Sequence, residues 1–281
     1  MKLPDTERWS ERAVVVRGLN PGPFTGPGTN TFLLGGGDRP LLLDTGAGKA
    51  GYLPLLEKAL ARECGTDAPG DIVLTHVHAD HIGGAPDVVE RFGPRRVLKF
   101  PWPERDRHFD VEITPLVDGE VVRGDGVTLR ALHTPGHAAD HLCYYLEEDK
   151  VLFTGDVILG AGTSVIPTEG GDMALYLRTL ERLLELDVAC IYPAHGPRIP
   201  AARAKIREYL DHRLQRERQI LAALDSGLRT VEAIVARVYA ETPEFLHHAA
   251  GQSVRSHLIK LEREGRVARD SSADGPDRWT A

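Results

Sequence analysis

The chain has 281 residues, 42% of them hydrophobic, and a formal net charge of −7. This suits one large domain with a buried core, alone or with a small appended domain. Three cysteines without a CxxC pair argue against a disulfide framework and a thiolate zinc site, and they favour a reducing, cytoplasmic location. The start has no secretory pattern and no apolar run reaches the roughly 18 residues of a membrane span, so we expect no membrane partner.

The first part of the chain reads as short apolar strands separated by glycine-rich turns. Strands are predicted at 13–19, 31–35, 40–44, 71–75, 96–100, 112–115, 120–122, 127–133, 142–146, 150–153 and 190–192. Helices are predicted at 51–64, 84–91 and 173–186, where apolar residues recur at helical spacing. Strands in hairpins, interrupted by a few helices, indicate an α+β fold with two sheets covered by helices.

Past Pro200 the pattern changes to helices, which predicts a catalytic domain at 1–200 and a second domain at 201–281. Helices are predicted at 201–225, at 230–240, from 242–244 onward with Pro243 at the first helical position, and at 252–264. Short strands at 266–270 and 278–281 flank a turn at 271–275. Helices followed by a two-stranded hairpin form a winged-helix-like pattern. Its last helix mixes basic and acidic residues, so substrate positioning or a homodimer contact is at least as well supported as DNA binding.

Charge is distributed unevenly between these two parts. Residues 1–200 carry 20 Lys and Arg against 29 Asp and Glu, whereas residues 201–281 carry 14 against 12. Phosphate binding normally recruits Lys and Arg, so the acidic first part disfavours a long nucleic-acid track without excluding a short substrate.

Four potential metal ligands stand in one short run directly after the predicted strand at 71–75. They are His76, His78, Asp80 and His81. Imidazole is mostly uncharged at neutral pH, and its lone pair is a good ligand for zinc, iron or manganese. The simplest physical reason to crowd these groups together is a shared cation. Three more candidates follow in glycine-containing turns near predicted strand ends, where chemistry usually sits: His137, Asp156 and His195.

Spacing divides the seven candidates into two sets of three and one bridging carboxylate, Asp156. In an extended backbone, side chains two residues apart point the same way, so His76 and His78 can bind one ion together. Asp80 and His81 begin the next turn and face the position of a second ion. The first set is His76, His78 and His137, and the second is Asp80, His81 and His195. A hydroxide held between two ions about 3.5–4 Å apart is the expected nucleophile. We expect two Zn²⁺, with iron or manganese as acceptable substitutes.

The run His76-Val77-His78-Ala79-Asp80-His81, with the later Thr-Pro-Gly-His, Thr-Gly-Asp and Ala-His-Gly segments, resembles the metallo-β-lactamase superfamily over residues 12–198. The resemblance implies a four-layer αβ/βα sandwich and the ligand roles given above. The absence of a ligand cysteine and the presence of Asp80 separate the chain from true β-lactamases, so antibiotic hydrolysis is not expected.

Other segments resemble the lactamase-beta-2-like branch of this superfamily. They are Asn20-Pro21-Gly22-Pro23 with Gly28-Thr29-Asn30-Thr31, the stretch at 134–141, and the tail segments at 239–244 and 257–265. The animal member of this branch is a mitochondrial endoribonuclease that acts on single-stranded RNA. The resemblance therefore implies phosphodiester cleavage of single-stranded RNA. Alternatives are thioester or lactone hydrolysis, as in hydroxyacylglutathione hydrolase-like branches, and a non-catalytic, metal-loaded binding module.

Two catalytic residues and a substrate loop are predicted. Asp80 would orient the nucleophile and collect its proton, and His141, four residues beyond His137, would protonate the leaving group. His141 could equally orient a ligand through a hydrogen bond. In the loop after Asp156, the hydroxyls of Thr163 and Ser164 are candidates for substrate binding.

Overall fold

A computed structural model of the chain describes residues 3–93, 95–271 and 277–281. The chain divides into two compact units. The first comprises Met1–Thr134, Asp140–Gly162 and Asp187–Ala202, and the second comprises Pro135–Ala139, Thr163–Leu186 and Arg203–Ala281. Each unit is described by itself below.

The first unit contains a seven-stranded sheet whose order follows the chain. Its strands are β1 (Thr6–Ser10), β2 (Ala13–Arg17), β3 (Asn30–Leu34), β4 (Leu41–Leu43), β5 (Ile72–Val73), β6 (Val97–Lys99) and β7 (Ile113–Pro115). Neighbours from β1 to β4 pair antiparallel, and those from β4 to β7 pair parallel. The parallel strands need crossovers, which carry the helices of this unit.

A five-stranded sheet completes the first unit, in the order β12-β11-β10-β9-β8. Its strands are β8 (Val121–Gly124), β9 (Val127–His133), β10 (Leu142–Leu146), β11 (Val151–Gly155) and β12 (Cys190–Pro193). All pairs are antiparallel except β11 with β12, which is parallel. Both predicted sheets are therefore present.

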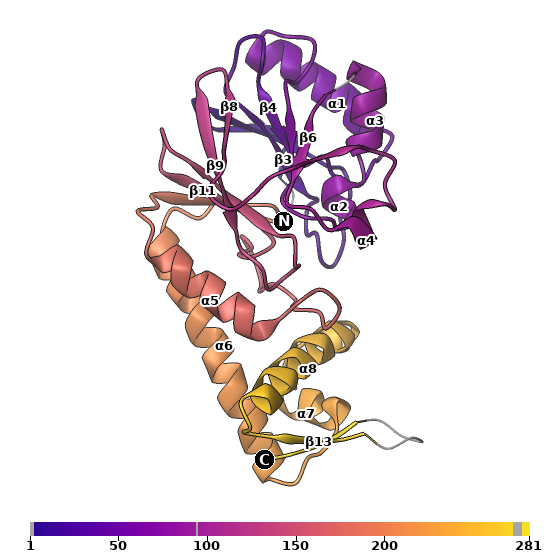
Figure 1. Ribbon diagram of the computed structural model, residues 1–281, viewed down its shortest axis with the longest axis vertical. Helices are drawn as coiled ribbons and strands as arrows, with labels where there is room; N and C mark the ends of the chain where they lie inside the picture. The colour runs from indigo at the N-terminus through magenta and orange to yellow at the C-terminus, as the bar shows by residue number, and fades with distance from the viewer. Residues whose placement is uncertain (1–2, 94, 272–276) are drawn as a thin grey trace. The chain divides into compact units, whose positions relative to one another are not determined.

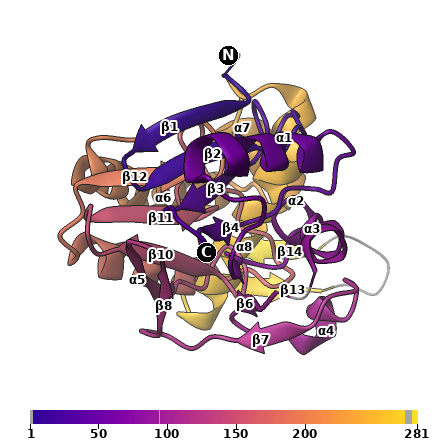
Figure 2. The ribbon, with the colours of Figure 1, turned by 90° about the horizontal axis from the view of Figure 1, so that it is seen from above.

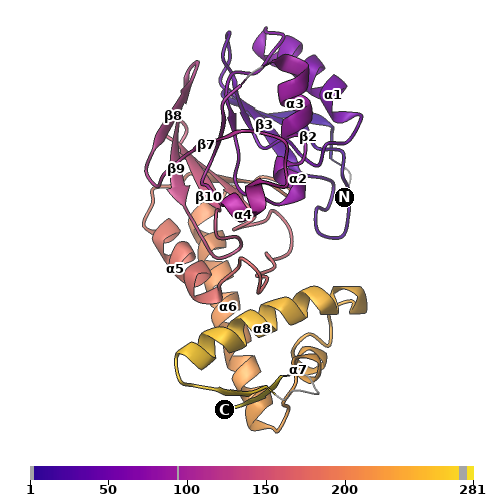
Figure 3. The same ribbon diagram turned by 45° about the vertical axis from the view of Figure 1, so that its right-hand side comes forward.

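One apolar core lies between the two sheets, and another lies beneath helices. In the first core, Phe32 from β3 meets Phe153 from β11 with ring centroids 4.9 Å apart. In the second core, the opposite face of the seven-stranded sheet packs against α1 (Tyr52–Ala59) and α3 (Ala85–Phe92). Figures 1 and 3 show the sheets side by side with α1 and α3 outside, and Figure 2 shows this unit from above. Strands β2, β3 and β11 are buried along their whole length because both faces are covered.

The second unit is mainly helical, with a two-stranded hairpin near the end. Its elements are α5 (Met173–Leu184), α6 (Ala202–Asp225), α7 (Val231–Val238), the 3₁₀ turn η2 (Glu244–Leu246), α8 (His247–Arg263), β13 (Ala268–Asp270) and β14 (Arg278–Thr280). Thr230 caps α7, because its side chain accepts a hydrogen bond from Ala233 N. Trp279 of the hairpin is fully buried in a core that includes Ile234 and Leu258.

Several element boundaries differ from the sequence prediction. The third and fourth tail helices are one: the turn η2 leads straight into α8, which runs through the position where a new helix was expected. Gly251 sits inside α8, where a Cβ would lie 3.6 Å from Val231 Cγ1 of α7. The edge strand β1 and the short helices α2 (Ala79–Ile82) and α4 (Pro103–Asp106) were not predicted, and the turn at 271–275 lies largely outside the described residues.

Within the described part of the chain, no helix is both long and apolar enough to cross a membrane.

Candidate metal centre

The histidine run lies where β5 ends and the one-turn helix α2 begins. His76 and His78 occupy the stretch between these elements, and His78 has extended backbone angles. Their ring nitrogens meet: His76 Nε2 lies 2.8 Å from His78 Nδ1. Two ring nitrogens this close can share a proton or bind one cation together. The two rings therefore point toward each other, and the binding of one ion by both stays a prediction.

The remaining imidazoles and carboxylates of the first unit converge on the same place. His195 Nε2 lies 3.1 Å from Asp156 Oδ1 and 3.3 Å from Asp80 Oδ2, and His81 Nε2 lies 3.5 Å from each of these oxygens. Within the first unit, two groups of three residues each bring their ligand atoms within 4.8 Å of one another. The first group is His76, His81 and Asp156, and the second is Asp80, His81 and His195. The structure thus brings together predicted ligands that are separated by up to 119 residues in the sequence.

The ring of His81 shows that these residues fit a cation. Its Nδ1 lies 2.8 Å from Asp44 Oδ2 and donates its proton there. Its Nε2 is buried and lies 3.5 Å from both Asp80 Oδ2 and Asp156 Oδ1. Burial lowers the pKa of the ring, but the carboxylates of Asp80, Asp156 and Asp44 raise it well above its ordinary value, so without a cation Nε2 carries a proton. A metal ion that replaced this proton would meet the Nε2 lone pair and the two carboxylates as one ligand set. Imidazole and carboxylate donors suit zinc, iron or manganese.

Charges inside the cluster shift the protonation of its members. Burial lowers the pKa of His195, but the nearby Asp156 carboxylate outweighs this and raises the pKa to about 9. Burial raises the pKa of Asp80, yet attraction to His81 and a hydrogen bond with His195 bring it to about 2. The carboxylates are therefore ionised at neutral pH, and a cation that binds here must displace protons from the imidazoles.

Asp44 positions this cluster and was missed by the sequence analysis. It directly follows β4, and its Oδ1 accepts a hydrogen bond from Thr75 N at 2.8 Å while Oδ2 accepts from His81 Nδ1. The Thr75 hydroxyl also lies 3.0 Å from His76 Nδ1. One carboxylate therefore fixes the backbone before the run and the tautomer of His81. The available signal was a charged residue that ends an all-apolar strand, Leu41-Leu42-Leu43-Asp44.

Asn30 holds the turn that carries His195. Its Nδ2 donates to Pro193 O at 2.8 Å and to Gly196 O at 2.9 Å, and the side chain is fully buried. The turn is fixed from both sides because Gly160 N also donates to His195 O at 2.7 Å. Asn30 belongs to the segment that resembled the lactamase-beta-2-like branch, but its role in positioning His195 was not foreseen.

His141 lies beneath Asp156. Asp156 N donates to His141 Nε2 at 3.1 Å, and His141 Nδ1 lies 2.9 Å from Thr134 Oγ1. The neutral ring therefore carries its proton on Nδ1. Gly155 permits this approach, since its φ is +46° and a Cβ there would lie 2.5 Å from His141 Nε2. The geometry supports the alternative in which His141 orients Asp156; proton donation to a leaving group stays a prediction.

A buried charge cluster adjoins His141. Lys99 is fully buried, and its Nζ lies 2.6 Å from Asp140 Oδ2 and 2.8 Å from Asp106 Oδ1. Burial raises the pKa of Asp140, and the neighbouring ammonium of Lys99 opposes the increase. Removal of Lys99 or Asp140 would leave the other charge buried without its partner, which is unfavourable. The Lys99–Asp140 ion pair therefore fixes the chain next to His141. Its only sequence signal was a lysine inside the apolar strand Val97-Leu98-Lys99.

His137 belongs to the second unit and is described with it. Its Nδ1 lies 2.8 Å from Val165 O and 3.1 Å from Ser164 Oγ. With Nδ1 engaged in this way, Nε2 is the ring nitrogen that a metal would take. Ser164 is buried against this ring, whereas Thr163 is exposed. Substrate binding by the two hydroxyls stays a prediction, and Thr163 is the more accessible of them.

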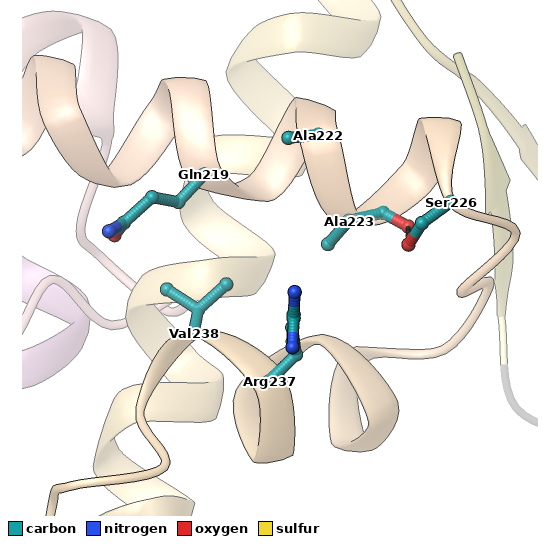
Figure 4. Close-up of a pocket in the computed structure, with 6 residues that line it drawn as sticks. All are labelled: Gln219, Ala222, Ala223, Ser226, Arg237 and Val238. Atoms are coloured by element: carbon teal, nitrogen blue, oxygen red, sulfur yellow. Dashed lines mark hydrogen bonds between the residues drawn. The ribbon is translucent and has the colours of Figure 1, made fainter.

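The surface cavities found in the two units are not lined by the predicted metal ligands. In the second unit, a cavity of about 280 Å³ lies between α6 and α7, where Arg237 faces the small side chains of Ala222 and Ala223 (Figure 4). In the first unit, a cavity of about 600 Å³ is lined by charged residues that include Arg39 and Asp71. Neither contains a predicted ligand, so ligand chemistry identifies the candidate site here.

Known proteins similar to this chain share both of its parts. The model of the metallo-beta-lactamase superfamily matches residues 24–195, and the model of the beta-lactamase associated winged helix domain matches residues 230–279. The chain is 42% identical to an atrochrysone carboxyl ACP thioesterase of Paecilomyces divaricatus, over 97% of this chain and 83% of that protein. It is 38% identical to the beta-lactamase-like protein 2 homolog of Caenorhabditis elegans, over 93% of this chain and 88% of that protein.

Solved structures give a consistent result. A metallo-beta-lactamase family protein from Thermus thermophilus superposes with a TM-score of 0.78 and 28% identity, covering 99% of each chain. TTHA1623 in a di-iron-bound form superposes with a TM-score of 0.53 and 27% identity, over 66% of this chain and 96% of that one.

Proposed function

The chain belongs to the metallo-β-lactamase superfamily and carries its associated winged-helix domain, and on this premise we propose that it is a hydrolase that uses two metal ions. The observation that carries the proposal is the convergence of buried imidazoles and carboxylates around His81 Nε2. The ions would be held by His76, His78 and His137, and by Asp80, His81 and His195, with Asp156 between them.

Zinc is the metal that we propose for both positions. The proposed ligand set has no thiolate, and imidazole with carboxylate suits zinc well. The likeness to TTHA1623, whose structure is di-iron-bound, supports a centre for two ions and makes iron the first rival. Metal analysis of the purified chain decides between zinc, iron and manganese.

The chain's own residues supply orientation and proton transfer. When bound, the cations would lower the pKa of water and polarise the oxygen of the scissile group. The Asp80 carboxylate would accept a hydrogen bond from the attacking water. His141 keeps Asp156 in place through the Asp156 N–H. The predicted transfer of a proton from His141 to the leaving group requires that hydrogen bond to break.

A carboxylic thioester is the substrate class that we infer. The similarity to atrochrysone carboxyl ACP thioesterases, at 42% identity over 97% of this chain, supports it. So does the excess of acidic residues in residues 1–200, because a thioester does not need a track of cations. In the reaction water adds to the acyl carbon, the carbon–sulfur bond breaks, and the departing thiolate takes up a proton.

Cleavage of single-stranded RNA, which the sequence resemblance implies, is the second candidate. It is favoured by the segments that resemble the lactamase-beta-2-like branch, together with the similarity to the beta-lactamase-like protein 2 homolog. A lactone is a third substrate for the same attack on an acyl carbon. A cytoplasmic location and a homodimer belong to this proposal. The former is supported by Cys64, Cys143 and Cys190, which form no disulfide in the part of the chain that the structure describes.

A parallel assay tests the function. Zinc-loaded protein is offered an acyl thioester, a lactone and labelled single-stranded RNA at equal concentration, with Asp80→Ala as the matched inactive variant. We expect thioester cleavage that chelation abolishes and that Asp80→Ala lowers by at least about 10²-fold. RNA cleavage with the same dependence on Asp80 would move the assignment to the second candidate. No turnover of any substrate by the metal-loaded wild type would refute the hydrolase.

A further inference from the structure

The segment that carries His137 is held by helices of the second unit. Thr179 Oγ1 of α5 donates to Pro135 O at 2.8 Å, and Asp172 N, at the start of α5, donates to Gly136 O at 2.9 Å. Gly136 also packs directly on α5, since a Cβ there would lie 2.4 Å from Tyr176 Cα. The backbone on the N-terminal side of His137 therefore has little freedom to move relative to α5.

The ring of His137 is oriented by a second segment of the same unit. Val165 O and Ser164 Oγ lie 2.8 Å and 3.1 Å from its Nδ1. These contacts fix the tautomer and the direction in which Nε2 points. The position of the Ser164–Val165 backbone consequently sets the position of this proposed ligand atom.

Arg213 of α6 contacts both segments that hold His137, namely the loop at Ser164–Val165 and helix α5. Its Nη2 donates to Ser164 O, and its guanidinium lies over the ring of Tyr176 of α5, 5.2 Å from the centroid. The side chain is 2% exposed. Helices α5 and α6 run side by side in the second unit (Figure 1), so a long side chain from α6 can reach the loop and α5 together.

The burial of Arg213 needs an explanation because it is costly. Its Nε is a buried donor without a hydrogen-bond partner, and it forms no ion pair with a carboxylate in the ranges that the structure describes. A buried charge without a counter-ion is unfavourable, and an apolar side chain could fill the same space. A planar group that stacks on Tyr176 and donates to a loop carbonyl does what an apolar side chain cannot.

We propose that Arg213 is a positioning residue for the metal centre: it holds the Ser164–Val165 backbone and so aims His137 Nε2 at the first metal position. This inference rests on the proposed function, in which His137 is a ligand. It makes the direction of that proposed ligand atom depend on α6.

Arg216, one turn further along α6, provides a matched control. Its guanidinium also stacks on a tyrosine, 4.5 Å from the centroid of Tyr239, and its Nη1 also donates to a backbone carbonyl, Val238 O at 3.0 Å. Neither contact involves the loop that orients His137. Arg213→Met and Arg216→Met therefore remove the same kind of interaction, and only the first removes it from the proposed metal centre.

The test measures zinc affinity by competition with a chromophoric chelator, with the unfolding temperature as a record of stability. We expect wild type to bind two ions, and Arg213→Met to bind one ion normally and the other about 10–100-fold more weakly. Arg216→Met should bind both as wild type does, even if it unfolds at a lower temperature. Arg213→Lys can donate to Ser164 O without the planar stack, so its affinity should fall between those of wild type and Arg213→Met.

The outcomes separate this inference from the proposed function. Two ions bound normally by a folded Arg213→Met would overturn the positioning role and leave the hydrolase intact. Equal weakening in both methionine variants would overturn it as well, because general destabilisation would then explain the loss. A wild type that binds no metal would refute the proposed function itself. If Arg213→Met does not fold, wild-type affinity in Arg213→Lys contradicts the inference and weakened affinity supports it.

Discussion

Asp44 is the residue on which the local order of the histidine run depends. It stands outside the run in sequence, yet its two oxygens hold Thr75 N and His81 Nδ1. Its φ of +56° is a conformation that Asn and Asp tolerate better than most residues. A carboxylate in this position both orients the imidazole and raises its strength as a ligand.

Asp44→Asn should weaken zinc binding by about 10–100-fold while it preserves the fold. The amide keeps the shape of the side chain and the backbone conformation, but its NH₂ group cannot accept the proton of His81 Nδ1. Calorimetric titration with zinc measures the change. The matched control is Asp125→Asn, since Asp125 accepts a hydrogen bond from Arg39 N and lies away from the cluster. Equal affinity in Asp44→Asn and wild type would contradict the role.

His212 makes stability depend on pH. Burial, followed by repulsion from Arg213 and Arg216, lowers its pKa to about 4. An unfolded chain binds a proton here at its ordinary pKa of about 6.5, so the unfolded state takes up the proton first as the pH falls. Its contribution to stability is therefore complete above pH 6.5 and is lost progressively between about 6.5 and 4.

Denaturant unfolding of wild type and His212→Gln at pH 7.5 and pH 5 measures this contribution. Wild type should lose more free energy of unfolding between the two pH values than the variant does, because glutamine does not titrate. The comparison cancels the carboxylates that titrate in the same window in both proteins. An equal loss in the two proteins would show that His212 does not carry the effect.

At the scale of elements, Gly136 links α5 to the segment of His137. Its φ is +134°, and a Cβ would lie 2.4–2.6 Å from backbone and side-chain atoms of Tyr176. Gly136→Ala should therefore displace the segment, destabilise the chain by more than about 1 kcal/mol and lower zinc affinity. Gly126→Ala is the control, because its φ is +76° but no atom lies within 4 Å of the added Cβ. Thermal unfolding and zinc titration of both variants test this, and the expectation fails if the two behave alike.

Sequence reasoning worked for elements whose signal is local. A few residues suffice to recognise an apolar strand, a helix with leucines at helical spacing, or the run of His76, His78 and His81. The predicted α+β fold of the superfamily is confirmed. The edge strand β1 is short and mostly polar, so it lacks the alternation that marks a strand. The sequence predicted two helices where α8 is one, and Gly251 lies within α8 although glycine is unfavourable in a helix interior.

Partners that are distant in sequence could not be predicted from one chain. Asp44 meets His81 across 37 residues, and Lys99 meets Asp140 across 41. The local sequence around one member of such a pair does not identify its partner, because the two segments become neighbours only in the folded chain. Arg213 is the clearest case: in sequence it is one of several charged residues on a long helix, and only burial distinguishes it.

At the scale of the whole molecule, net charge and metal-ligand chemistry affect different steps of the proposed reaction. The excess of acidic residues in residues 1–200 affects which substrates approach, and the buried imidazoles and carboxylates affect the hydrolysis of a bound substrate. The hydrolase activity therefore rests on the metal centre, whichever of the proposed substrates is correct.

Counting the metal bound to the folded chain tests that centre most directly. Elemental analysis after zinc loading and dialysis should give two ions for each wild-type chain. His195→Ala removes a ligand from only the second set, so it should keep one ion, and it should lose thioester cleavage. One ion or none in a folded, active wild type would contradict the two-metal account.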